Sequence, residues 1–117
     1  MGLQQEIRQT KPFASLQEEA VLSVLKTADV LRRRIAKALE STGLSNEQYN
    51  VLRILRGAGK AGLPTLDVAS RMIEQAPAIT RLMDKLEAKK LVHRVRCKED
   101  RRQVLCYITE EDLNRLP

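Results

Sequence analysis

Aromatic residues are scarce in this sequence. It has no tryptophan, and Phe13, Tyr49 and Tyr107 are its only aromatics among 117 residues. A platform of stacked aromatic rings for single-stranded nucleic acid is therefore not expected. The hydrophobic core must instead be built from aliphatic side chains.

Cysteine and histidine are also rare, with only Cys97, Cys106 and His93 present. Two cysteines are too few for a disulfide scaffold. They fall on opposite arms of a predicted hairpin, where we interpret them as small apolar residues rather than as a redox sensor. The sequence shows no metal-ligand spacing, no nucleophile–base pair and no complete phosphate loop, and the glycine-rich segment 57–62 is interpreted as a connector. We therefore expect no enzyme, no metal and no cofactor.

Long hydrophobic runs are missing as well. None approaches the roughly 18 residues that span a bilayer, and the polar N-terminus of mixed charge does not resemble a signal peptide. The chain is 43% hydrophobic and 31% charged, which suits about one globular domain. These features predict a cytoplasmic protein with no membrane partner.

Positive charge, by contrast, is abundant and unevenly distributed. The net charge is +6, and residues 49–109 hold thirteen Lys or Arg against six Asp or Glu. Residues 1–48 are nearly balanced, with seven against six. A local excess of this kind is what phosphate binding requires. Charge alone leaves an ordinary solvated basic surface as an equal alternative.

The N-terminal third predicts an arm and a long helix. Residues 1–12 are expected to form a flexible arm, and a helix is predicted from about Ser15 to Ser41. Ser15 and Glu18 have the spacing of a capping box, and apolar residues recur at three- and four-residue steps. About 27 residues is long for a helix in so small a domain. We therefore expect part of it to pack outside its own core.

Residues 44–71 predict two further helices. Gly43 ends the long helix, and Ser45 or Asn46 caps the next one. Leu63-Pro64 is expected to be extended, because proline disfavours helix in the residue before it. Thr65 is predicted to cap a short helix that ends near Arg71 and places Leu66 and Ala69 inward.

The segment after this short helix predicts a second helix and a hairpin. Pro77 suits the first position of a helix that continues to about Lys89. Leu91–Cys97 alternates as a strand does, with Arg94 and Arg96 on one face, and Val104–Thr109 favours a second strand. The basic loop 98–102 joins them, and residues 110–117 are predicted to start another helix.

A helix pair followed by a basic hairpin is typical of double-stranded DNA readers. The second helix enters the major groove, and the hairpin reaches the backbone or the minor groove. Within a recognition helix of about 76–89, small Ala76 and Ala78 would let the backbone approach the bases. Ala78 or the Thr80 methyl could meet a thymine methyl, and Arg81 is the candidate for a bidentate guanine contact. The alternative for Arg81 and Lys85 is simple helix solubility.

The hairpin loop contains an acidic residue between basic ones. We expect Asp100 either to pair with Arg102 or to cap the turn, so that an arginine points outward. Arg101 and Arg102 could then enter a narrow minor groove, where the potential is most negative. An ordinary hairpin tip with compensating charges is the alternative. The residues predicted to contact DNA are Thr65, Gln75, Ala76, Pro77, Ala78, Thr80, Arg81, Lys85, Arg94, Arg101 and Arg102, with Asp100 organising the wing.

Five motifs stand out along the chain: Leu44-Ser45-x-x-Gln48-Tyr49-x-Val51-Leu52, Ile79-Thr80-Arg81-Leu82-x-Asp84-x-Leu86-Glu87, Leu91-Val92, Asp100-Arg101-Arg102 and Ile108-Thr109. Together they resemble the MarR family of winged helix-turn-helix transcriptional regulators, over about residues 13–113. The resemblance implies a mainly α fold with a small β-hairpin wing (α+β), in which residues 44–109 form the DNA-binding domain. It implies dimers on palindromic operators, often repressors released by small-molecule effectors or oxidants. It also implies base contacts from Thr80 and Arg81, and minor-groove contact from Arg102.

The sequence departs from this family in two ways. Asp112 stands where the family usually has glycine, and the long C-terminal helices are represented only by residues 110–117. In the family those helices and the first helix form the dimer interface and a wall of the ligand pocket. We therefore expect either a truncated product or a protein that forms homodimers mainly through its first helix, within 13–43. The other function left open is a winged-helix module that binds proteins without specific DNA binding.

Overall fold

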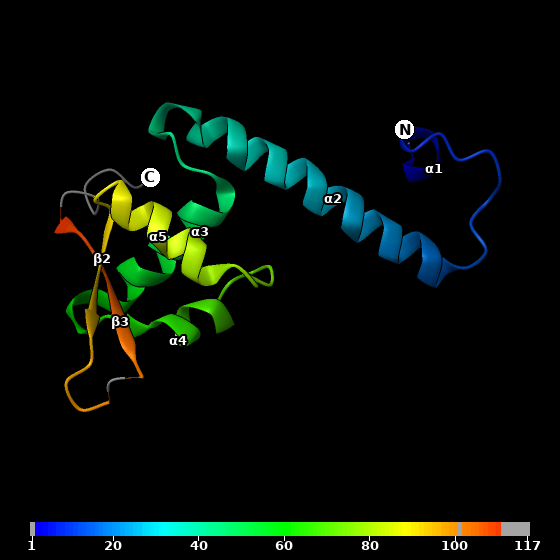
Figure 1. Ribbon diagram of the computed structural model, residues 1–117. Helices are drawn as coiled ribbons and strands as arrows, with labels where there is room; N and C mark the ends of the chain where they lie inside the picture. The colour runs from blue at the N-terminus through cyan, green and yellow to red at the C-terminus, as the bar shows by residue number, and fades with distance from the viewer. Residues whose placement is uncertain (1, 101, 111–117) are drawn as a thin grey trace. The chain divides into compact units, whose positions relative to one another are not determined.

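The computed structural model describes residues 2–100 and 102–110, and the chain divides into two compact units (Figure 1). The first unit holds residues up to Glu40, and the second begins at Ser41. The helix predicted over residues 110–117 lies, apart from Glu110, outside the described residues.

The first unit is dominated by one long helix, α2 (Leu16–Leu39). Ser15 caps it, because the Glu18 N–H donates to Ser15 Oγ over 3.1 Å. The Glu18 carboxylate accepts from the Ala14 N–H at 2.9 Å, one residue outside a standard capping box. A short 3-10 helix, Glu40–Thr42, then leads to Gly43, whose φ of +72° ends the element. The long helix is confirmed, while the predicted arm contains a short helix, α1 (Leu3–Glu6).

The second unit combines helices with a small antiparallel sheet, which confirms the predicted fold class (Figure 1). The sheet order is β1-β3-β2, so that β3 lies between the other two strands. The Leu63-Pro64 segment is extended, as predicted, and it pairs with β3 as a third strand, β1, that the sequence did not predict. The elements are α3 (Asn46–Ala58), η2 (Gly59–Ala61), β1 (Leu63–Pro64), α4 (Thr65–Ser70), α5 (Ile79–Ala88), β2 (Val92–Arg96) and β3 (Val104–Ile108).

Helix α3 begins with a complete capping box. The Gln48 N–H donates to Ser45 Oγ at 3.1 Å, and the Ser45 N–H donates back to Gln48 Oε1 at 3.0 Å. Lys89, just after α5, donates from Nζ to the same Gln48 oxygen and to the Gly43 carbonyl. The cap therefore stabilises α3, and the contacts with Lys89 link the end of α5 to the start of α3.

The core of the second unit is aliphatic, as the scarcity of aromatic residues predicts. Its fully buried side chains come from three helices and two strands, and their packing fixes how α4, α5 and the hairpin lie against α3. They are Val51, Leu52, Leu55, Val68, Met83, Leu86, Val92 and Cys106.

The orientation of α4 differs from the prediction. Leu66 is 79% exposed, whereas Val68 is fully buried. Thr65 does not cap the helix, since Pro64 occupies the cap position and Thr65 is the first helical residue. Ala69 faces inward as predicted, but Thr65 and Val68 complete the inward face, and Leu66 is turned outward.

Helix α5 starts later than predicted. Residues 76–78 form a turn in which the Ile79 N–H donates to the Ala76 carbonyl, and the helix begins at Ile79. Ala78 occupies the cap position with φ −103° and ψ 36°, outside helical geometry, and its side chain cannot cap. The expectation that Pro77 is the first helical residue is therefore wrong.

The register of the hairpin separates the two cysteines. Cys106 lies opposite Arg94 in the β2–β3 ladder, whereas the Cys97 N–H donates to the Gln103 carbonyl near the loop. Cys106 is fully buried, and burial raises the pKa of its thiol. The two thiols therefore do not oppose each other across the hairpin, and Cys106 is a core residue.

Among the residues with described positions, no helix has the length and apolarity needed to cross a membrane. The longest, α2, carries charged side chains along its length.

Candidate nucleic-acid interface

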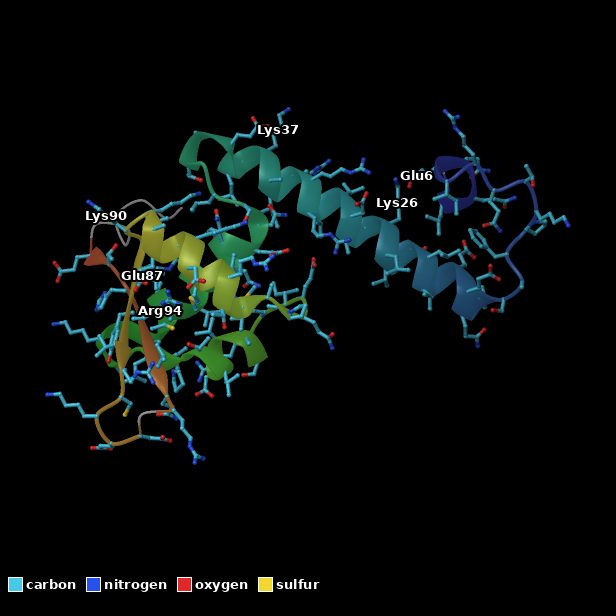
Figure 2. All side chains as sticks on the ribbon, viewed as in Figure 1. Glu6, Lys26, Lys37, Glu87, Lys90 and Arg94 are labelled. Carbon is cyan, nitrogen blue, oxygen red and sulfur yellow. The ribbon has the colours of Figure 1, made fainter. Side chains whose placement is uncertain are left out.

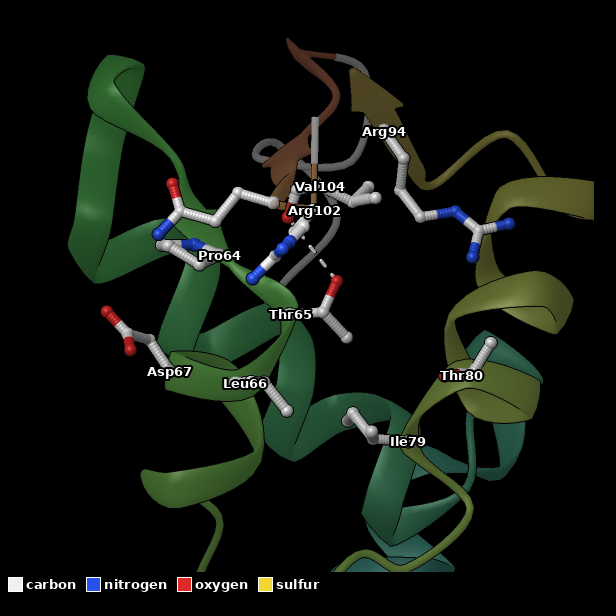
Figure 3. A pocket seen from close by; sticks show the side chains of 10 residues that line it. Pro64, Thr65, Leu66, Asp67, Ile79, Thr80, Arg94, Arg102 and Val104 are labelled. Atoms are coloured by element: carbon white, nitrogen blue, oxygen red, sulfur yellow. Dashed lines mark hydrogen bonds between the residues drawn. The ribbon is translucent and has the colours of Figure 1, made fainter. Parts of the chain in front are cut away.

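Helix α4, helix α5 and the wing surround a cleft of about 430 Å³ (Figure 3). The start of each helix forms one wall, and the base of the wing closes the remaining side. The cleft thus gathers parts that are up to 40 residues apart in sequence. Its lining residues are Pro64, Thr65, Leu66, Asp67, Ile79, Thr80, Arg94, Arg102, Gln103 and Val104.

Thr65 ties α4 to the wing at the base of this cleft. Its hydroxyl donates to the Val104 carbonyl at 3.4 Å and lies 3.4 Å from Cys106 Sγ (Figure 3). The side chain was predicted to be a helix cap and a DNA contact. The predicted helix cap is wrong, because the hydroxyl joins α4 to β3. The DNA contact stays a prediction.

Helix α5 has one buried face and one polar face. Ile79, Met83 and Leu86 enter the core, and Arg81 and Asp84 lie on the side away from them. The predicted DNA-contact residues Thr80, Arg81 and Lys85 are all exposed. Thr80 also lines the cleft on the side nearer the wing.

The predicted contacts that precede α5 lie in a turn rather than in the recognition helix. Gln75, Pro77 and Ala78 are exposed there. Ala76 is partly buried and packs against the core. The predicted approach of the Ala76 backbone to the bases stays a prediction, and it would be made from this turn rather than from within α5.

Arg94 lies on the inner face of β2 and reaches α5 (Figure 2). Its Nη2 lies 2.7 Å from Asp84 Oδ1 and 2.8 Å from Glu87 Oε1. Its backbone N–H donates to Glu87 Oε2 at 3.1 Å. The hydrogen bond from the guanidinium lowers the pKa of Glu87, and the two carboxylates raise the pKa of Arg94. Arg94 is thus held by three contacts within the protein.

The wing turn is organised by Asp100. The Arg102 N–H donates to Asp100 Oδ1 at 3.0 Å, and the Gln103 N–H donates to the Asp100 carbonyl at 3.0 Å. Of the two roles expected for Asp100, capping the turn is therefore the one observed. Arg102 is exposed and lines the cleft beside Thr65 (Figure 3). Arg101 lies outside the described residues.

Asp84 and Glu87 were not predicted as site residues. Their spacing of three places both carboxylates toward one side of a helix. Their partner Arg94, however, lies on strand β2, ten residues from Asp84 and seven from Glu87. Helical periodicity and strand alternation each assign a face without matching one face to the other. The exposed Leu66 at the cleft was missed because α4 was assigned the wrong orientation.

Other chemistry is sparse on the described part of the chain. Among residues 2–100 and 102–110, no group of three or more His, Cys, Asp or Glu side chains could hold a metal ion. His93 stacks on Tyr107 with ring centroids 4.9 Å apart. The candidate site is therefore a cleft lined by Arg94 and Arg102, next to a helix face that exposes Arg81 and Lys85.

Comparison with known protein families gives a match over residues 33–116. The matching family is described as the transcriptional regulator SarA/Rot. The match covers most of the chain, including all of the second unit except its last residue. No curated protein sequence matches the chain.

Solved structures of transcription factors share the fold. A MarR transcription factor from Planctomyces limnophilus is 39% identical, with a TM-score of 0.75 over 90% of this chain and 76% of that one. A complex of S. aureus MepR with DNA is 23% identical, with a TM-score of 0.74 over 83% and 70%. AbsC, a MarR family transcriptional regulator from Streptomyces coelicolor, is 22% identical, with a TM-score of 0.78 over 91% and 72%. The first of these proteins is thus a transcription factor, and the third is a transcriptional regulator.

Proposed function

The chain belongs to the MarR family of winged-helix transcriptional regulators, and we propose that it binds double-stranded DNA in a sequence-specific manner. The observation that carries the proposal is the presence of exposed cationic side chains on both α5 and the wing. Arg81 and Lys85 are exposed on the polar face of α5, and Arg102 of the wing lines the cleft next to the start of that helix. MepR, which has the same fold, has been crystallised with DNA.

In the proposed complex, α5 lies in the major groove and the wing meets the minor groove. Arg81 donates two hydrogen bonds to a guanine edge, and the Thr80 methyl contacts a thymine methyl. Lys85, about one turn further along, meets a phosphate. Arg102 enters the minor groove, with Asp100 holding the turn that presents it.

We further propose that the protein is a repressor that acts as a homodimer on a palindromic operator. The exposed apolar side chains of α2, among them Val24, Leu31 and Ile35, support a second copy as partner. A two-fold dimer would place one recognition helix on each half-site. A small-molecule effector that releases the DNA belongs to the same proposal.

A binding assay on duplexes selected from a random pool tests the proposal. We expect affinity to fall steeply with salt, as for proteins that displace counterions from phosphates. Arg81→Ala is expected to lose about 1–3 kcal/mol of discrimination at one base pair. Arg102→Ala is expected to weaken binding to selected and scrambled duplexes alike. Fluorescence anisotropy across a salt series measures the salt dependence of affinity, the base discrimination of Arg81→Ala and the affinity of Arg102→Ala for each duplex.

Lys90→Gln is the matched control for these variants. It also removes one positive charge, but it lies in the turn after α5, at the end away from the cleft (Figure 2). We expect its affinity to stay close to that of the unsubstituted protein. Unchanged binding by both the Arg81 and Arg102 variants would contradict the proposed contacts.

A further inference from the structure

Arg94 is surrounded by carboxylates even though it lies at the edge of the proposed DNA-binding surface. Its side chain is 21% exposed, whereas those of Asp84 and Glu87 are 58% and 40% exposed. Glu87 holds it at two points, the backbone N–H and Nη2. The same Nη2 reaches Asp84 Oδ1 at 2.7 Å. The contacts with Glu87 thus fix the guanidinium in a position from which it also contacts Asp84.

Asp84 occupies an unfavourable place for a negative charge. It follows Arg81 by three residues on the polar side of α5, so the two side chains are neighbours on the surface proposed to enter the groove. A free carboxylate there would repel the DNA phosphates. It would also compete with guanine for the Arg81 guanidinium, since charge-assisted pairs of Arg with carboxylate are strong.

We propose that Arg94 is a positioning residue for DNA reading, which neutralises Asp84 and leaves Arg81 available for a base. The inference rests on the proposed function and changes the part first predicted for Arg94, that of a direct DNA contact. Glu87 holds Arg94 in place, and Arg94 in turn joins β2 of the wing to the recognition helix. Arg94 thus acts on DNA binding through Asp84 and Arg81.

The two roles of Arg94 have different experimental signatures. If Arg94 neutralises Asp84, removing Arg94 does harm only while Asp84 is charged, and removing that charge restores binding. If Arg94 contacts a phosphate, its loss lowers the slope of log affinity against log salt by about 0.9. In that case, substitution of Asp84 gives no specific rescue.

The test compares Arg94→Ala, Asp84→Asn and the double variant on the selected duplex. We expect Arg94→Ala to bind about tenfold more weakly and to lose discrimination at the base pair read by Arg81. We expect the double variant to recover most of both losses, and Asp84→Asn alone to bind at least as well as the unsubstituted protein. Arg94→Lys keeps the charge but not the planar fork, so it should fall between Arg94→Ala and the unsubstituted protein. Lys90→Gln again controls for the loss of one charge.

Thermal unfolding of each variant separates this role from a purely structural one. A loss of stability in Arg94→Ala that persists in the double variant, while base discrimination returns, supports the proposal. Failure of Asp84→Asn to restore discrimination in the Arg94→Ala background overturns it and leaves the proposed function intact. Absence of salt-dependent DNA binding by the unsubstituted chain overturns both.

Discussion

At the scale of single residues, Glu87 shows how the fold changes an ionisable group. The hydrogen bond from the Arg94 guanidinium lowers its pKa below the ordinary value of 4.5, and the positive charge of Arg94 acts in the same direction. A carboxyl group with a lowered pKa stabilises the folded state above its unfolded pKa. That stabilisation is lost as the pH falls through the folded value. Because the Glu87 side chain is partly exposed, solvent keeps the effect small.

This linkage predicts how Glu87→Gln changes the acid sensitivity of the protein. We expect the variant to be less stable than the unsubstituted protein near neutral pH, because the amide that replaces the carboxylate carries no charge for Arg94. The difference should begin to shrink as the pH falls below about 4.5, where Glu87 of the unfolded chain becomes protonated, and it should be lost as the pH falls through the lower pKa of the folded state. Urea unfolding between pH 7 and pH 3 measures it. Glu99→Gln, the same change in the exposed wing loop, is the control and should not show this narrowing.

Single residues also show where sequence reasoning about the site succeeds. The exposure of Thr80, Arg81 and Lys85 follows from the apolar stripe of α5. Once a strong helical period identifies the buried positions, the remaining positions of the helix must face solvent. The wing turn held by Asp100 follows from the local chemistry of Asp side chains, which cap turns two residues ahead. Both inferences need only neighbours in sequence. The role of Arg94 depends on carboxylates that lie on another element. Its contacts with Asp84 and Glu87 could therefore not be predicted from the sequence.

At the scale of elements, α4 was the least predictable, and the reason is its length. Six residues make less than two turns, so a single apolar residue is enough to suggest the wrong face. Leu66 is larger than Val68, yet Val68 is the buried one. The packing of Thr65 against β3, far away in sequence, fixes this orientation. The much longer α2 and α3 were predicted correctly, because several turns and a capping serine agree.

The orientation of α4 can be tested by a pair of alanine substitutions. Val68→Ala should lower the free energy of unfolding by roughly 2 kcal/mol, from about 0.8 kcal/mol per buried methylene group plus the cavity left behind. Leu66→Ala removes more atoms but should change stability by at most about 0.5 kcal/mol, because an exposed side chain loses little. Chemical denaturation of both variants measures the two values. A larger loss for Leu66→Ala would show that α4 is turned the other way.

At the scale of the whole molecule, α2 is notable because the first unit leaves most of its apolar side chains exposed. Val24, Leu25 and Leu31 are each more than half exposed. Val24, Leu31 and Ile35 recur at helical spacing, and with Ala20 and Ala28 they form a continuous apolar stripe. Apolar surface of this extent is costly in water, and a second copy of the same helix would cover it with a self-complementary stripe.

The dimer proposal predicts that one charge in this stripe separates the protomers. Val24 is 68% exposed, so Val24→Glu should not disturb the fold. In a two-fold interface both protomers carry the substitution, so two buried valine side chains are lost. At roughly 1.5 kcal/mol for each buried valine, the loss is about 3 kcal/mol, or over a hundredfold in the dimer dissociation constant. Sedimentation velocity over a concentration series measures this constant directly.

Lys26→Glu provides the control, because Lys26 lies on the opposite side of the same helix. It should leave the dissociation constant nearly unchanged, whereas Val24→Glu should also weaken binding to a palindromic duplex, since a monomer holds only one half-site. A single half-site duplex should then bind both variants equally well. Should Val24→Glu remain as dimeric as the unsubstituted protein, the interface must lie outside this stripe of α2.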